Sequence, residues 1–121
     1  MNLCEKGRRA EDLAARYLRS LGYRIWKSNW RWGRKELDLV VTYKGVLVVV
    51  EVKSMDGNPL NEPSLVVGPE KQRYLVLAAE AFIRQHGWKG PTRFDVIAVI
   101  YRADGVEIEH FENAFIPTVE W

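Results

Sequence analysis

Three charged residues stand within stretches that are otherwise built of valine and leucine. Asp38 interrupts the apolar segment over residues 36–41, and Glu51 and Lys53 end the next apolar run. Because side chains alternate along a strand, Glu51 and Lys53 are expected on one face, one pleat apart. A tight turn at residues 44–45 would return the chain, and equal counting from this turn sets Asp38 opposite the region of Glu51. The sequence therefore predicts two carboxylates and an ammonium close together.

Such a group of charges favours a divalent metal ion. Two carboxylates buried together repel each other, and desolvation adds to the penalty. Carboxylate oxygens are hard ligands that suit Mg²⁺ or Mn²⁺, and a metal with few protein ligands can activate water and stabilise charge on phosphorus. We predict that Asp38 and Glu51 hold the metal, and that Lys53 orients or deprotonates the attacking water or neutralises the phosphate. The alternative is internal pairing of these charges without catalysis.

The elements that must position these residues follow from hydrophobic periodicity and turn residues. The expected elements, in chain order, are a helix over 5–21, a strand over 23–29, a basic turn over 31–35, a hairpin of strands over 37–43 and 46–53, a loop over 54–68, a helix from 69 to 85, and strands over 94–101 and 106–110. The order α-β-β-β-α-β-β predicts an α/β fold in which helices flank a central mixed β-sheet. A length of 121 residues fits one domain over residues 1–121.

Composition and charge restrict the class of protein. The single cysteine excludes an intrachain disulfide, and the longest strongly apolar run is too short to span a bilayer. We therefore expect a cytoplasmic protein without membrane association. Residues 1–35 carry ten Lys or Arg against three Asp or Glu, a net charge of +7, whereas the remainder carries a net charge of −5. A basic third beside a cluster of carboxylates indicates an anionic partner, although a solvated basic helix face would give the same pattern.

Two motifs carry a family resemblance. Residues 36–38, followed across a β-turn by residues 51–53, resemble the D…(D/E)xK signature of PD-(D/E)XK nucleases, with Leu37 in place of the usual proline. More closely, the chain resembles the YraN-like family of small proteins over nearly its whole length. The matching positions are Gly7, Glu11, Ala14, Tyr17-Leu18, Gly22-Tyr23, Asn29 with Arg31, Glu36-Leu37-Asp38-Leu39, Val50-Glu51-Val52-Lys53, Lys71 and Arg93-Phe94-Asp95-Val96.

The resemblance implies a restriction-endonuclease-like fold and kinship with archaeal Holliday-junction resolvases. It also implies that Glu11, on the first helix, joins the metal site. Glu11 lies on the same helical stripe as the small and apolar positions of that helix, although pairing with Arg8 or Arg16 is the alternative. The chain departs from the family pattern at Lys35, where a glycine is usual, and at Met55, where an arginine is usual.

Several charged residues are candidates for binding nucleic acid. The segment over residues 24–35 interleaves aromatic with basic side chains, a composition that suits phosphates and unstacked bases, or else a core strand with solvated bases. Lys71 lies in the first turn of the second helix, where the helix dipole disfavours a cation, so a phosphate contact is one interpretation. The residues that we assign to nucleic-acid contact are Arg31, Arg34, Lys35 and Lys71.

Four other charged or titratable residues stay open or receive a structural interpretation. Glu36 shares the strand of Asp38 and is either a ligand or an exposed strand end. For Asp95 we favour a structural pair with Arg93. The two histidines, His86 and His110, lack the spacing of metal ligands.

The sequence thus predicts a metal-dependent endonuclease that acts on DNA, including branched or single-stranded DNA. A homodimer would suit a substrate with two strands to cut. The alternative function is a module that binds nucleic acid or protein on the same fold without cutting, and a third is a structural protein whose charges pair internally.

Overall fold

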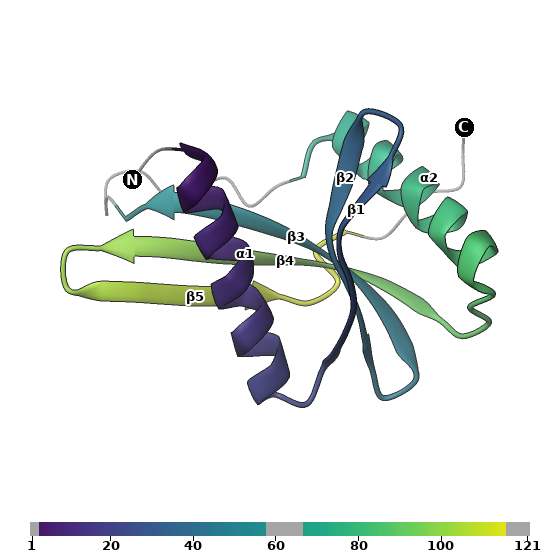
Figure 1. The fold of residues 1–121 in the computed structure, drawn as a ribbon, viewed down its shortest axis with the longest axis horizontal. Coiled ribbons are helices and arrows are strands. Elements are labelled where there is room, and N and C mark those ends of the chain that lie inside the picture. The colour runs from purple at the N-terminus through teal and green to yellow at the C-terminus, as the bar shows by residue number, and fades with distance from the viewer. Residues whose placement is uncertain (1–2, 58–66, 116–121) are drawn as a thin grey trace.

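Two helices and five strands make up the computed structural model, which describes residues 3–57 and 67–115 (Figure 1). Their order confirms the predicted α-β-β-β-α-β-β arrangement of an α/β fold. The elements are α1 (Leu3–Ser20), β1 (Arg24–Trp32), β2 (Lys35–Tyr43), β3 (Val46–Asp56), α2 (Pro69–His86), β4 (Thr92–Arg102) and β5 (Gly105–Phe111).

The five strands form one mixed sheet in the order β1-β2-β3-β4-β5. β3 is central, antiparallel to β2 and parallel to β4. Its apolar residues 47–50 are buried on both faces, which is typical of a central strand. α1 crosses one face and α2 covers the other face near β1 and β2 (Figure 1). Each helix packs on its own hydrophobic cluster, so the sheet separates two cores.

Local sequence explains where the helices begin and end. α1 presents Ala10, Ala14 and Leu18, all almost completely buried, as a stripe at helical spacing. α2 starts with Pro69, whose missing N–H is no loss in a first turn. It ends at Gly87, which has a φ of 70° and donates its backbone N–H to the carbonyl of Ile83.

The β2–β3 hairpin turns at Lys44 and Gly45, as predicted. Both residues have positive φ angles, of 49° and 79°, which is the geometry of a two-residue hairpin turn that matches the twist of the strands. This turn fixes the register that pairs Val41 with Val48 and Leu39 with Val50. Equal counting from the turn was therefore a valid way to place Asp38.

Two predicted boundaries were wrong. The basic turn expected over residues 31–35 is confined to Gly33 and Arg34, because Trp32 and Lys35 still pair across the β1–β2 hairpin. The loop expected from residue 54 starts later, because β3 continues to Asp56 in its pairing with β4. Most of that loop, residues 58–66, lies outside the described residues. Neither described helix is long and apolar enough to cross a membrane.

A buried polar network on the α1 side holds β4, β5 and the chain after β5 together. Asp95 is 1% exposed and accepts two hydrogen bonds from the guanidinium of Arg93, both at 2.9 Å. It also contacts His110 Nε2 at 2.7 Å and accepts the backbone N–H of Asn113 at 3.1 Å. The other ring nitrogen of His110 lies 3.1 Å from the hydroxyl of Tyr17 on α1. The predicted Arg93–Asp95 pairing is confirmed, and His110 belongs to the same structural network.

We expect Asp95→Asn to destabilise the protein by about 3–5 kcal/mol, because it leaves Arg93 without its buried partner charge. Burial alone would raise the pKa of Asp95, but the hydrogen bonds from His110 and Arg93 outweigh it and hold that pKa below its ordinary value. The carboxylate therefore stabilises the fold above the ordinary pKa of 3.8, and this contribution is lost as the pH falls through the folded-state pKa.

Urea unfolding at neutral and acidic pH measures both effects. The control is Glu107→Gln, which removes an exposed ion pair with Arg102 and should change stability by less than about 1 kcal/mol. Equal stability of the Asp95→Asn protein and the wild type would contradict a stabilising role for the network.

Candidate functional site

The site lies in the middle of the sheet, at the point where β2 separates from β3, which we call the fork. Leu39↔Val50 is the last described pair of the two strands. Leu39 packs into the cluster under α1, whereas Leu37, two residues earlier, packs into the cluster under α2. A regular strand would place both leucines on one face, so β2 changes face at Asp38. The carboxylate of Asp38 therefore lies toward β3 and accepts the backbone N–H of Val52 at 2.9 Å.

Asp38 and Glu51 form a close pair of carboxyl groups. Burial, followed by the negative charge and the hydrogen bond of Glu51, raises the pKa of Asp38 to about 8, although the backbone N–H of Val52 opposes this rise. At neutral pH and without a bound cation, Asp38 therefore keeps its proton and lies in hydrogen-bond contact with Glu51. A cation bound between the two groups would replace this proton and neutralise their negative charge.

Glu51 and Lys53 share the face of β3 that is opposite α1. Val50 and Val52, which alternate with them, pack into or against the cluster under α1. Glu51 is 13% exposed and lies 3.3 Å from the ammonium of Lys71 on α2. Lys53 is half-buried one pleat further along β3. The structure thus brings Asp38 and Glu51 together at the fork, and Lys53 follows two residues after Glu51 on the same face of β3.

Glu11 approaches the same fork from α1. Among the described residues its hydrogen-bond partner is Asn29 of β1, with Asn29 Nδ2 donating to Glu11 Oε2 at 2.8 Å, and neither Arg8 nor Arg16 pairs with it. Burial raises the pKa of Glu11, the Asn29 bond opposes this rise, and the charges of nearby acids, among them Glu36 and Glu51, add to it. The negative charge of the acidic site therefore acts on Glu11, while the hydrogen bond from Asn29 holds its side chain.

Asn29 matches the family pattern described above, but its contact with Glu11 was not predicted. Its φ angle is 51°, in the left-handed region that asparagine tolerates better than most residues. On either side of it, Ser28 pairs with Leu39 and Trp30 pairs with Leu37. The irregular residue therefore lies across from Asp38. The signals in the sequence were the family match of Asn29 with Arg31 and an asparagine within an otherwise β-forming stretch.

The donor set defines what kind of metal site is available. No group of three or more His, Cys, Asp or Glu side chains lies close enough together to hold a metal ion within residues 3–57 and 67–115. The Asp38–Glu51 pair remains. Mg²⁺ usually takes one or two carboxylates and fills its other positions with water and substrate phosphate oxygens. Two carboxylates at a partly open fork fit that mode of binding.

The predicted nucleic-acid residues divide into two groups. Arg31, Arg34 and Lys35 are exposed at the end of the β1–β2 hairpin. Lys71 instead pairs with Glu51, and its ammonium also lies 5.7 Å from the centre of the Tyr74 ring, which Lys35 approaches at 5.3 Å. The tryptophans of β1 are partly buried against the α2 cluster rather than presented for base stacking, and they are Trp26, Trp30 and Trp32.

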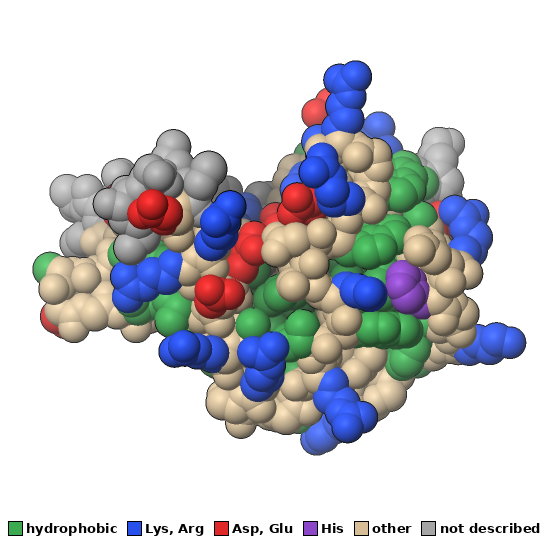
Figure 2. All heavy atoms as spheres, viewed as in Figure 1, with side chains coloured by type: hydrophobic (Ala, Val, Ile, Leu, Met, Phe, Trp, Pro, Cys, Tyr) green, Lys and Arg blue, Asp and Glu red, His purple; other side chains and the backbone are tan. Residues whose placement is uncertain are grey.

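The surface around the fork has a mixed charge. Figure 2 shows acidic side chains gathered between α1 and the β1–β2 hairpin, with Lys and Arg side chains on both sides of them. Besides burial, the charges of Glu36 and Glu51 raise the pKa of Glu11. Besides burial, the charges of Glu51 and Glu11 raise the pKa of Asp38. An anionic substrate would meet basic groups at the margins before it reached the carboxylates.

Lys71 competes with any cation at Glu51, because its ammonium occupies the approach to that carboxylate. We expect Lys71→Met to tighten Mn²⁺ binding by about 3- to 10-fold, since a partly exposed ion pair contributes about 1 kcal/mol. Titration calorimetry measures the change. Lys35→Met is the matched control, because Lys35 also lies on the Tyr74 ring but has no ion pair with Glu51 among the described residues. Weaker Mn²⁺ binding by the Lys71→Met protein would contradict this competition.

Together the fold and the site define an α/β protein in which two central strands separate beside a close pair of carboxyl groups. The chain belongs to the family described as "Uncharacterised protein family UPF0102", whose model matches residues 10–99. A UPF0102 protein of Porphyromonas gingivalis is 42% identical over 113 residues, or 92% of this chain and 84% of the relative. A UPF0102 protein of Phocaeicola vulgatus is 36% identical over 115 residues, or 95% of each chain. A third, of Syntrophotalea carbinolica, is 43% identical over 110 residues, or 90% of this chain and 89% of the relative.

Proposed function

We propose that the protein is a metal-dependent endonuclease that hydrolyses DNA phosphodiester bonds, built on a restriction-endonuclease-like fold. The observation that carries this proposal is the Asp38–Glu51 carboxyl pair at the fork, with Lys53 two residues after Glu51 on the same face of β3. A buried pair of acids is unfavourable by itself, and a divalent cation offsets its repulsion.

In this proposal Asp38 and Glu51 hold Mg²⁺ or Mn²⁺, which supplies Lewis-acid stabilisation of the phosphate and a bound water of lowered pKa. The N–H of Val52 holds the Asp38 carboxylate in the orientation required. Glu11, held by Asn29, adds negative charge at the α1 side of the site. A rotation of its side chain away from Asn29 would bring it in as a further ligand.

Lys53 has the role of orienting or deprotonating the attacking water, or of neutralising the phosphate. The half-buried position of this lysine beside two acids suits either task. A cation held by Glu51 would replace Lys71 at that carboxylate, and Lys71 would then be placed to contact a phosphate from the first turn of α2. Arg31, Arg34 and Lys35 guide the DNA backbone toward the fork. Cleavage of two strands at a junction would require two copies of the chain.

The proposal is tested by titrating Mn²⁺ into the protein by calorimetry and by a cleavage panel of branched, single-stranded and duplex DNA with Mg²⁺ or Mn²⁺. We expect metal binding that depends on Asp38, and metal-dependent cleavage of at least one substrate. Wild-type protein that binds the metal but cuts none of these substrates would overturn the endonuclease and leave a binding module.

A second candidate function is a non-catalytic module that binds nucleic acid or protein. The observation that favours it is the Glu51–Lys71 ion pair, which already neutralises part of the acidic site without a metal. Met55 also lacks the positive charge that the family pattern places there. The calorimetric titration discriminates between the two functions: a protein without measurable Mn²⁺ binding that still binds DNA would support the module.

A further inference from the structure

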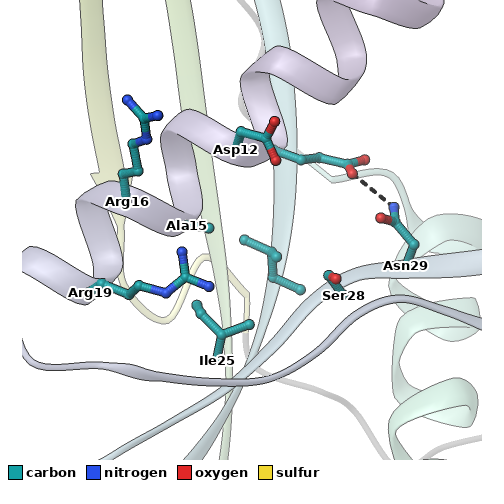
Figure 3. A pocket seen from close by; sticks show the side chains of 9 residues that line it. Asp12, Ala15, Arg16, Arg19, Ile25, Ser28 and Asn29 are labelled. Carbon is teal, nitrogen blue, oxygen red and sulfur yellow. Dashed lines mark hydrogen bonds between the residues drawn. The ribbon is translucent and has the colours of Figure 1, made fainter.

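A pocket of about 310 Å³ opens between α1 and β1 (Figure 3). Acidic and amide groups lie toward one end and two arginines toward the other, over a floor of small and apolar side chains. The lining residues are Glu11, Asp12, Ala15, Arg16, Arg19, Ile25, Ser28, Asn29 and Leu39.

The two arginines are available to an anion. Arg16 and Arg19 are exposed, and neither takes part in an ion pair within the described part of the chain. In Figure 3 the Arg19 side chain reaches from α1 over Ile25 in the direction of Ser28, while Arg16 lies at the rim. A guanidinium and a serine hydroxyl are donors that suit a phosphate oxygen.

The pocket shares Glu11 with the proposed catalytic site, and one stripe of α1 runs from Glu11 along the pocket. Glu11, Ala15 and Arg19 are spaced four residues apart and therefore lie on one side of the helix. From Glu11 to Arg19 the helix advances about 12 Å at 1.5 Å per residue. Three to four nucleotide steps at about 3.4 Å cover the same distance along a duplex. A strand that leaves the fork along α1 would thus reach the arginines after a few nucleotides.

We propose that this pocket is a subsite for a backbone phosphate of the bound DNA strand, a few nucleotides from the scissile phosphate. The inference rests on the proposed endonuclease function and extends it. The phosphate lies at the Arg19 end, with Ser28 as a hydroxyl donor and Arg16 at the rim. Glu11 and Asp12 at the other end repel the phosphate, so it is held at the Arg19 end of the pocket.

The test is DNA binding by the double variant Arg16→Gln/Arg19→Gln, measured by fluorescence anisotropy on a short labelled duplex. Ca²⁺ replaces Mg²⁺, and the salt concentration is varied. We expect about tenfold weaker binding at low salt, and a slope of log K against log salt that is smaller by about one, because one phosphate contact is lost. The matched control is Arg84→Gln/Lys89→Gln, which removes two exposed charges on the α2 side of the sheet and should leave both quantities near the wild-type values.

The outcomes separate the subsite from the proposed function. A double variant that binds like the wild type overturns the subsite and leaves the endonuclease proposal intact. Weaker binding with a reduced slope, in a protein that neither binds Mn²⁺ nor cuts DNA, supports the subsite and overturns the endonuclease. An equal loss in the control variant shows a general charge effect and overturns the subsite. Wild-type protein that does not bind DNA at low salt overturns both.

Discussion

Replacing Lys53 by Met is expected to lower the rate of Mn²⁺-dependent DNA cleavage by on the order of 10³-fold. The substitution removes the ammonium beside the Asp38–Glu51 pair and keeps a side chain of similar length. The attacking water then loses the group that orients it or takes its proton, while the carboxylates are unchanged. Single-turnover cleavage at saturating Mn²⁺ measures the loss in the chemical step rather than in binding.

Two measurements make this result specific to catalysis. The Lys53→Met protein should still bind Mn²⁺ by calorimetry and should keep the wild-type circular dichroism spectrum. Lys89→Met is the matched control, since it removes an exposed lysine to which no role in binding or cleavage is assigned and should cleave at the wild-type rate. A Lys53→Met enzyme that cleaves within about tenfold of the wild-type rate would remove this lysine from the mechanism.

The element order and the register of the central hairpin could be predicted because they depend on local patterns. Apolar residues at helical spacing define α1, and residues 44–45 set a two-residue turn whose register follows by counting. That register was sufficient to bring Asp38 near Glu51. The roles of these residues in metal binding and catalysis stay predictions.

The details of the site could not be predicted because they depend on departures from regular structure. Strict alternation would have placed Asp38 on one face of β2, but the strand changes face between Leu37 and Leu39. The left-handed Asn29 lies across from this change and holds Glu11. No periodic pattern encodes either feature, because each arises where two strands separate and the backbone leaves its regular twist.

Contacts between distant segments were also out of reach of the sequence. Lys71 follows the loop after β3, so its meeting with Glu51 depends on where that loop places α2 against the sheet. His110 had no ligand spacing, yet the β4–β5 pairing brings it to Asp95. The predictions for His110 and Lys71 both rested on local position: the contacts confirm a structural role for His110, whereas the phosphate contact of Lys71 stays a prediction.

Asp38→Asn is expected to have opposite effects on activity and on metal-free stability. The pKa of Asp38 is raised by burial, and then by Glu51, from 3.8 to about 8. The folded protein therefore binds this proton more tightly than the unfolded chain does. The wild type consequently loses stability as the pH rises from about 4 to about 8. The asparagine stays neutral and can still accept the Val52 N–H, so the variant should not lose this stability.

At pH 9 without metal, the Asp38→Asn protein should exceed the wild type by on the order of 2–5 kcal/mol in the free energy of unfolding, and the difference should shrink toward pH 4. Mn²⁺ at about 100 times its dissociation constant should stabilise the wild type by about 2.7 kcal/mol but leave the variant unchanged, and the variant should not cut DNA. Asp12→Asn, at an exposed position of α1, controls for the removal of a negative charge. A variant less stable than the wild type at pH 9 would show that Asp38 is a structural carboxylate, since a group kept for metal binding destabilises the fold until the metal arrives.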